Sequence, residues 1–258
     1  MISIARTVAI ALLGFAALAA NAQNRTFLAV DRMHIPEGQS SEAYIATEKL
    51  WQRLHQRAVD TGICLSWALY KVENGGRTHY ATVRAYNSLD KMSNPWPESI
   101  AKDLYSPEES KMMSQTGKTR DLIHAELLGM EAAATGDGKP DPSDSISVEY
   151  MKPKPGKGNE YYTMEKDTYS KIHQARVKAG EMKSWYFLSR RFPRGTDSEF
   201  DFITVNVYPK NGGGWNSKII ETALGKDEAA KLGDPGNVRT MVRSEVWHPV
   251  LSTTPATK

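Results

Sequence analysis

Apolar and polar positions along the chain fall into two successive sets of elements in the same order. Each set begins with a short strand rich in β-formers, followed by a helix with a polar start and a glycine stop, and then by two strands joined by a turn. A second helical region and a last strand complete each set. The predicted strands are 27–33, 63–72, 79–86 and 120–128, then 146–151, 182–191, 200–208 and 239–247, and the predicted helices are 41–61, 99–114, 159–179 and 217–231.

The two sets also match residue by residue, with small changes of offset in the hairpin between the second and third strands and again after it. Self-similarity at a nearly fixed offset indicates a repeated structural unit. The match includes tryptophans and His-Gln pairs, so chance does not explain it. Aligned pairs include Val30 with Val148, Tyr44 with Tyr162, His55-Gln56 with His173-Gln174, Ser66-Trp67 with Ser184-Trp185, and Glu126 with Glu245.

The order β-α-β-β-α-β is the ferredoxin-like arrangement, and it occurs twice. One such unit leaves a sheet face that its own helices cannot cover, and two copies can bury those faces against each other. The sequence therefore resembles the dimeric α/β-barrel superfamily, in a single-chain duplicated form, over about residues 25–250. We expect an α+β fold in which tandem duplicated ferredoxin-like units pair as a pseudo-twofold α/β barrel.

This resemblance rests on element order and duplication, and no diagnostic catalytic motif accompanies it. The superfamily includes antibiotic-biosynthesis-type monooxygenases, haem-binding and haem-degrading enzymes, and lactone isomerases. The fold alone cannot choose among these activities. The sequence itself implies no particular cofactor.

The N-terminal segment is typical of an export signal. Arg6 lies in a short basic region, an apolar stretch runs from Val8 to Ala19, and Ala20-Asn21-Ala22 has the small-x-small pattern of a cleavage site. We expect residues 1–22 to be a signal peptide and the protein to be periplasmic or secreted. The remaining chain divides into a first repeat at 23–131, a linker at 132–144, a second repeat at 145–250 and a tail at 251–258.

Charge and cysteine content narrow the range of functions. The formal net charge is +3 over 258 residues, and basic side chains are dispersed among acidic ones, so nucleic acid is not an expected partner. No segment after the leader approaches the length of a membrane span. Cys64 is the only cysteine, which excludes an intrachain disulfide, and its aligned partner Met182 favours a buried apolar role over a nucleophilic one. We find no spacing typical of a metal site.

The first helix of each repeat carries the best candidates for chemistry. Trp51 and His55 lie one turn apart on one face, and Tyr169 and His173 repeat the pattern. An inward imidazole beside aromatic rings can act as a general base or ligate haem iron. The alternative is a structural histidine hydrogen-bonded to a strand residue, and the retention of both histidines favours it. The candidate catalytic residues are His55 and His173.

Two further pairs complete the candidate site. Trp67 and Trp185 each lie at the start of a strand, where an indole can wall a ligand pocket or anchor the core. Arg120 and Arg239 share a strand face with Glu126 and Glu245. Facing inward they could bind a carboxylate, and facing outward they would form ion pairs of little energetic weight. The candidate ligand-binding residues are Trp51, Trp67, Tyr169, Trp185, Arg120 and Arg239.

These patterns lead to one principal prediction, an exported protein that binds a small molecule in an α/β barrel, with monooxygenase-like activity as its enzymatic form. Two alternatives stay open, a non-catalytic secreted binding or structural protein and a haem-binding protein. Whether the chain is an enzyme, and its oligomeric state, are not determined by the sequence.

Overall fold

The computed structural model describes residues 26–93, 95–136, 143–195, 197–210, 214 and 216–254. The predicted signal peptide, the middle of the predicted linker and the last residues of the predicted tail lie outside the described residues. The chain divides into two compact units, one containing the residues up to Leu127 together with those from His248 onward, and the other containing Leu128–Trp247. We call them unit 1 and unit 2.

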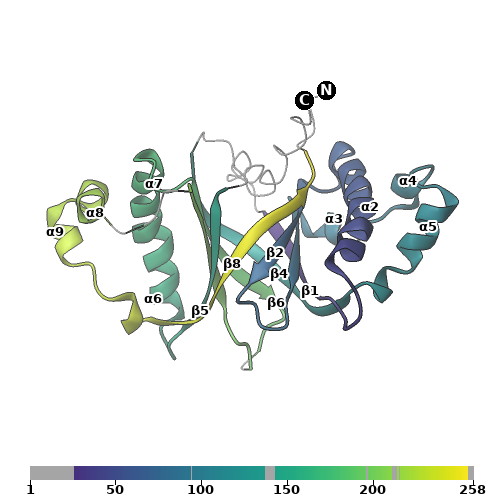
Figure 1. Ribbon diagram of the computed structural model, residues 1–258. Coiled ribbons are helices and arrows are strands. Elements are labelled where there is room, and N and C mark those ends of the chain that lie inside the picture. The colour runs from purple at the N-terminus through teal and green to yellow at the C-terminus, as the bar shows by residue number, and fades with distance from the viewer. Residues whose placement is uncertain are drawn as a thin grey trace. The chain divides into compact units, whose positions relative to one another are not determined.

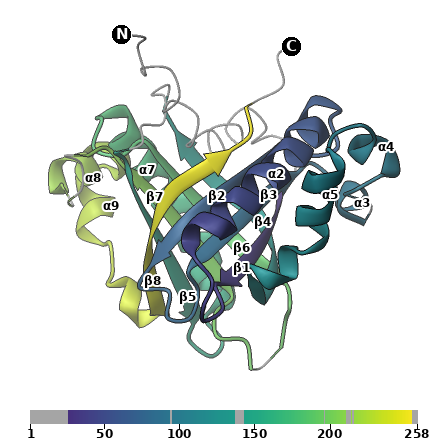
Figure 2. The same cartoon turned by 45° about the vertical axis from the view of Figure 1, so that its right-hand side comes forward.

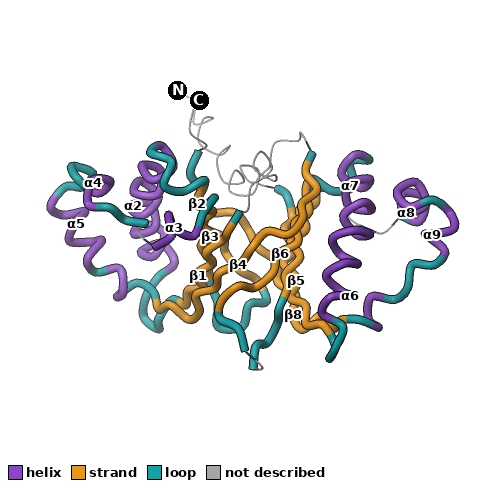
Figure 3. The backbone as a smooth tube through the Cα atoms, turned by 180° about the vertical axis from the view of Figure 1, so that it is seen from behind, coloured by secondary structure: helices purple, strands orange, loops and turns teal. Residues whose placement is uncertain are grey.

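Unit 1 contains three complete strands and the long helix α2 (Figure 1). In Figure 3, the short helices α4 and α5 lie on the side of α2 that faces away from the strands. The elements are β1 (Phe27–His34), α2 (Ser41–Asp60), β2 (Ser66–Glu73), β3 (Tyr80–Tyr86), α3 (Leu89–Ser93), α4 (Glu98–Ala101), α5 (Pro107–Ser114), the 3-10 turn η1 (Thr116–Lys118) and the first part of β4 (Asp121–Thr135).

Unit 2 follows the same order, but its long helix is interrupted by a π-helical turn. Helix α8 packs against α7 on the side away from the strands (Figures 1 and 2). The elements are β5 (Ser145–Pro153), α6 (Gly158–Thr163), the π-helical turn η2 (Met164–Tyr169), α7 (Ser170–Lys178), β6 (Ser184–Phe192), β7 (Phe202–Tyr208), α8 (Ser217–Leu224), α9 (Lys226–Ala230), the 3-10 turn η3 (Pro235–Asn237) and β8 (Arg239–Ser252).

The strand order, followed along the hydrogen bonds, is β1-β3-β2-β8-β5-β7-β6-β4 and closes on itself as a barrel. Strand β3 pairs antiparallel with β1 and β2, and β7 pairs antiparallel with β5 and β6. Strands β4 and β8 each contribute residues to both units. This topology confirms the predicted α+β barrel fold.

Residues aligned between the two halves occupy equivalent places in the two ladders. In each unit, the tryptophan that follows the long helix lies opposite a polar residue of the next strand, and an acidic residue of the first strand lies opposite a threonine. The matched pairs are Trp67–Arg84 with Trp185–Asn206, and Asp31–Thr82 with Glu149–Thr204. Positions in the two units can therefore be compared directly.

Each long helix packs its apolar face on the strands of its own unit. In unit 1, Ser40 caps α2 by accepting a hydrogen bond from the amide of Ala43, and Gly62 follows the helix with a positive φ of 71°. Tyr44 and Trp67 join the unit 1 core, as Tyr161 and Trp185 join the unit 2 core. Cys64 is buried, and burial raises the pKa of its thiol to about 12, so it serves as an apolar core residue.

Several boundaries differ from those that the sequence predicted. Strand β4 continues to Thr135, into the segment predicted as linker, and β8 continues to Ser252, into the predicted tail. Just beyond β8, the hydroxyl of Thr253 accepts a hydrogen bond of 2.9 Å from the amide of Trp67. These residues are ordered because their backbone groups find partners, which composition does not reveal. In the described part of the chain, no helix is both long and apolar enough to cross a membrane.

Candidate functional site

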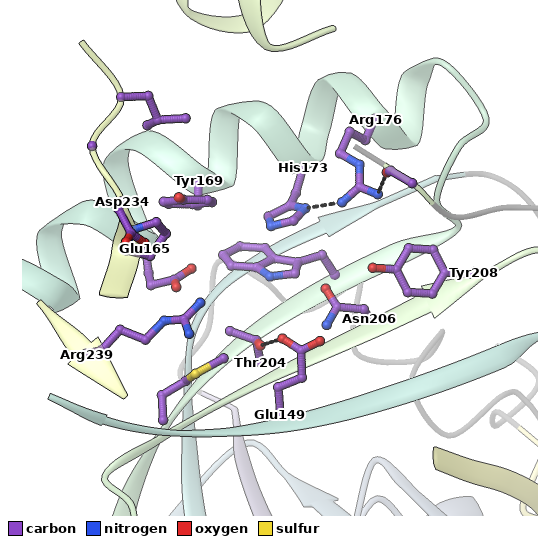
Figure 4. Close-up of a pocket in the computed structure, with 16 residues that line it drawn as sticks. Glu149, Glu165, Tyr169, His173, Arg176, Thr204, Asn206, Tyr208, Asp234 and Arg239 are labelled. Carbon is purple, nitrogen blue, oxygen red and sulfur yellow. Dashed lines mark hydrogen bonds between the residues drawn. The ribbon is translucent and has the colours of Figure 1, made fainter. Parts of the chain in front are cut away.

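A pocket of about 620 Å³ lies in unit 2 between its long helix and the strands β5, β6 and β7. Figure 4 shows Tyr169, His173 and Arg176 reaching from the helix toward the strands, and Glu149, Thr204 and Asn206 rising from the opposite side. Arg239, at the start of β8, and the segment 232–235 complete the lining. The volume suits a small organic ligand.

His173 lies flat on Trp185, with ring centroids 4.7 Å apart and planes 19° apart. Burial, together with the nearby Arg176 guanidinium, lowers the pKa of His173 to about 3. Since Arg176 can only donate, the contact of 3.5 Å between its Nη1 and Nδ1 of His173 assigns the ring proton to Nε2. His173 is thus a neutral imidazole at physiological pH.

Arg176 is held in place on several sides. Its Nη2 donates a hydrogen bond of 2.6 Å to the carbonyl of Gly214, and its Nε lies 3.6 Å from a carboxylate oxygen of Glu181. The guanidinium also lies over the ring of Tyr208, at 5.7 Å from its centroid. These contacts hold the Arg176 side chain at one end of the pocket, where it orients the imidazole of His173.

Glu165 and Arg239 lie beside each other at the other end of the pocket (Figure 4). Glu165 is only 4% exposed, and its burial raises the pKa of its carboxyl to about 7, against the opposing effects of Tyr161 and Arg239. Arg239 forms no ion pair with any described residue, and its buried Nε has no hydrogen-bond partner among them. A carboxyl that titrates near neutrality beside an arginine is typical of a functional site.

The floor of the pocket adds a second carboxylate. Glu149 accepts a hydrogen bond of 3.3 Å from the hydroxyl of Thr204, while the Asn206 amide donates to the hydroxyl of Ser147 at 3.2 Å. In the described chain no cation forms an ion pair with Glu149. The pocket therefore combines aromatic walls with both carboxylates and arginines.

The π-helical turn changes the alignment of the two halves. Tyr169 follows Glu165 by four positions, whereas Trp51 follows Glu48 by three. Tyr161, rather than Tyr162, therefore fills the core position of Tyr44, because the extra residue shifts the register ahead of the turn. The same shift makes Glu165 the counterpart of Glu48, and burial raises the pKa of both carboxyls to about 7.

The predicted site residues separate into two groups. Tyr169, His173, Trp185 and Arg239 come together in the unit 2 pocket. Their unit 1 counterparts lie in a packed cluster, where His55 stacks on Trp67 at 4.8 Å between centroids. Burial, together with Arg84 and Arg120, lowers the pKa of His55 well below its ordinary value. The cluster contains Trp51, His55, Trp67 and Arg120.

The ion pairs of the two predicted arginines and of the glutamates aligned with them differ from the expected pairing. Arg120 pairs with Glu48, whereas Glu126 lies near Arg32, with 3.8 Å between carboxylate oxygen and Nε. Glu245 pairs with Arg243 at 3.0 Å and accepts hydrogen bonds from Tyr150 and Trp247. Glu126 and Glu245 belong to separate local networks, whereas Arg120 lies in the unit 1 cluster and Arg239 in the unit 2 pocket.

The sequence prediction did not include the three carboxylates of the pocket, Glu149, Glu165 and Asp234, or its amide, Asn206. The only available signal was a glutamate on the buried face of each long helix, one turn after the core tyrosine. An ungapped alignment of the two repeats hides that signal, because it ignores the extra residue of the π-helical turn and pairs Glu48 with Lys166.

The closed strand order is that of the dimeric α/β-barrel fold. Among solved structures, the chain is similar to a proposed monooxygenase from Fusobacterium nucleatum, with a TM-score of 0.57 and 12% identity over 91% of this chain and 96% of that one. A proposed monooxygenase from Lactobacillus acidophilus has a TM-score of 0.51 and 9% identity over 90% of this chain and 97% of that one. These likenesses establish the fold alone. No family model matches the chain, and a search of curated proteins finds no match.

The pocket lining does not fit a haem. A porphyrin requires a wide apolar slot, but three carboxylates, Glu149, Glu165 and Asp234, line this pocket. The ring of His173 is already stacked on Trp185, and its Nδ1 is engaged by Arg176. Among the described residues, no group of three or more histidines, cysteines or carboxylates could hold a metal ion. The donor set favours a smaller, polar ligand.

Proposed function

We propose that unit 2 binds a small planar molecule that carries a weakly acidic hydroxyl group, and that the protein acts on it as a monooxygenase-like enzyme. The observation that supports this most strongly is Glu165, a buried carboxyl with a pKa of about 7 beside an arginine that has no ion-pair partner among the described residues. A group with a pKa near the working pH can both take and return a proton.

Each part of the pocket has a distinct task in this proposal. Tyr169 and the His173–Trp185 stack bind the planar body of the ligand. Glu165 takes the hydroxyl proton, and Arg239 stabilises the oxyanion that remains. We assign the proton to Glu165 instead of His173, because an imidazole whose pKa is lowered to about 3 is a weak base.

The oxygenation step follows from that anion. An enol ligand is the tautomer of a ketone with an acidic CH2 group, and its enolate is electron-rich enough to reduce dioxygen. The CH2 group becomes a carbonyl, one oxygen atom of O2 enters the product, and the other leaves as water with the two hydrogens. One O2 is consumed for each ligand molecule, and no other reductant enters the balance.

We also propose that the protein is exported and that its units arose by tandem duplication. Export is supported by the leader-like pattern of residues 1–22. Duplication is supported by the equal strand registers of the two units. A non-catalytic binding protein would share the pocket and would consume no oxygen.

Calorimetric titration with 4-nitrophenol tests the binding proposal, since this planar phenol ionises near neutral pH and its ionisation can be followed by its colour. We expect one molecule to bind per chain, with an affinity that falls above pH 7, because ligand and Glu165 then both become anions in one site. In the Glu165→Gln variant this fall should be largely lost.

The matched control is Glu48→Gln, which changes the equivalent buried carboxyl of unit 1. It should bind 4-nitrophenol with the affinity and pH dependence of the parent protein. No binding to the parent, or the same response in both variants, would contradict the proposed site. Oxygen uptake with any co-purified enolic ligand separates the enzyme from the binding protein.

A further inference from the structure

We propose that Asn206 keeps the unit 2 pocket open, and that unit 1 is a closed counterpart of the same site whose space is filled by the side chain of Arg84. This inference rests on the proposed function only in treating the unit 2 pocket as the ligand site. It identifies a residue that decides where this protein can bind a ligand.

The two positions are equivalent by strand register. Arg84 lies opposite Trp67, as Asn206 lies opposite Trp185. On the neighbouring strand the equivalence extends to the two acids, Asp31 and Glu149, which both face a threonine. A change from a long cation to a short amide is therefore the main difference at this point of the two floors.

In unit 1 the Arg84 side chain is fixed by its neighbours. Its Nη2 lies 2.6 Å from the Asp31 carboxylate, and its guanidinium lies over the Trp96 ring at 5.9 Å from the centroid. Trp96 in turn meets His55 edge-on at 4.7 Å. Among these neighbours, Asp31 and His55 correspond to Glu149 and His173, which line the pocket of unit 2.

A second ion pair closes the other end of the unit 1 cluster. Arg120 pairs with the buried Glu48, and its guanidinium lies 5.7 Å from the centroid of Trp51. The Trp51 indole donates a hydrogen bond of 3.1 Å to the hydroxyl of Thr116. Arg84 and Arg120 are therefore each paired with a carboxylate of their own unit, so a ligand is not needed as their counter-charge.

Among its described residues, unit 2 has no equivalent of the Arg84–Asp31 pair or of the Arg120–Glu48 pair. Asn206 is too short to reach across the floor and donates to Ser147 instead, at 3.2 Å. Glu149 consequently keeps no cation, and Arg239 forms no ion pair with Glu165. A ligand in unit 2 could supply the opposite charge to Glu149 and Arg239, as Arg84 does for Asp31 and Glu48 does for Arg120 in unit 1.

The Asn206→Arg variant tests the proposal directly. Its guanidinium should pair with Glu149, as Arg84 pairs with Asp31, and fill the pocket. We expect the affinity for 4-nitrophenol to fall at least tenfold while the Tm is kept or raised. The matched control Asn206→Ala removes side-chain volume and should retain binding within a few-fold of the parent.

A readout without ligand keeps this test separate from the proposed function. In the Glu149→Gln background, Asn206→Arg should lower the Tm, since the added cation then lacks its partner. The same Tm change in both backgrounds would overturn the proposal, even if the parent protein binds no 4-nitrophenol. Unaltered 4-nitrophenol affinity in Asn206→Arg would overturn it as well.

A reciprocal variant covers the case in which Asn206→Arg does not fold. Replacing Arg84 and Asp31 together by asparagine removes the ion pair from unit 1 without leaving a single charge. The double variant should gain a second, weaker 4-nitrophenol site, so that the calorimetric stoichiometry rises above that of the parent. An unchanged stoichiometry would overturn the proposal.

Discussion

The imidazole of His173 stacks on the indole of Trp185, with 4.7 Å between ring centroids. Unit 1 repeats the arrangement with His55 on Trp67, at 4.8 Å and with the planes only 12° apart. Both imidazoles are buried, and burial lowers both pKa values. A neutral histidine stacked on a strand tryptophan is thus part of the interior of each unit, and chemistry at the pocket is added to it.

Replacing each histidine by alanine separates the structural role from ligand binding. Both His55→Ala and His173→Ala remove a buried ring from a packed stack, and each should lower the free energy of unfolding by about 2 to 4 kcal/mol. Urea denaturation measures this loss. Only His173→Ala should also weaken 4-nitrophenol binding, and an equal loss of affinity in both variants would exclude unit 2 as the site.

The stability of the protein should depend on pH through Glu165. Its pKa is raised from 4.5 to about 7 by burial, so the folded state favours the neutral form. The stability that the neutral Glu165 carboxyl gives the fold is fully present below pH 4.5 and is lost as the pH rises through 7. Glu165→Gln stays neutral, so it should be more stable than the parent at pH 8, by up to about 3 kcal/mol, and equally stable at pH 4.

The control for that comparison is Glu160→Gln, at an exposed position of α6. Its free energy of unfolding should match the parent at both pH values. A Glu165→Gln protein that is no more stable than the parent at pH 8 would show that the carboxyl is already ionised in the fold.

The arginines of the two units should differ in their effect on stability. Arg120→Ala leaves Glu48 buried without its partner and should cost about 3 to 5 kcal/mol at pH 8. Arg239→Ala removes a cation that forms no ion pair among the described residues, so its cost should be smaller. Chemical denaturation of both variants checks this order, and a larger loss for Arg239→Ala would reverse the assignment of open and closed sites.

Export has its own test. If residues 1–22 are a signal peptide, protein recovered from the cell exterior or the periplasm should begin near Gln23. Intact-mass measurement after expression with the full leader gives the answer. A chain that keeps its first residues in every cell fraction would contradict export.

Much of the fold could be predicted from the sequence. Alternating apolar positions and glycine-terminated helices located every long element, and the repeat located the aromatic and histidine side chains that line the pocket. The second helical regions were less predictable. Pro107 lies within the first, predicted as one helix over 99–114, and begins the separate helix α5, and Gly225, with a φ of 83°, separates α8 from α9.

The polar half of the site could not be predicted, because it depends on a π-helical turn and on side-chain reach. The extra residue of the turn cannot be seen in the sequence, because aromatic residues at Tyr162 and Tyr169 still match Tyr44 and Trp51 without a gap. Whether Arg84 closes a pocket, or Asn206 leaves it open, depends on neighbours from three strands. Their equivalence follows from the strand registers, and the sequence does not show the space around either side chain.

If Glu165 is the titrating group of a ligand pocket, its carboxyl should respond to the ligand in an NMR titration. The carboxyl carbons of 13C-labelled glutamate can be titrated by NMR with and without 4-nitrophenol, using Glu165→Gln and Glu48→Gln to assign the two signals. We predict midpoints of about 7 for both carboxyls, with only that of Glu165 shifting when ligand is added. A Glu165 midpoint near 4.5 that the ligand leaves unchanged would contradict the account.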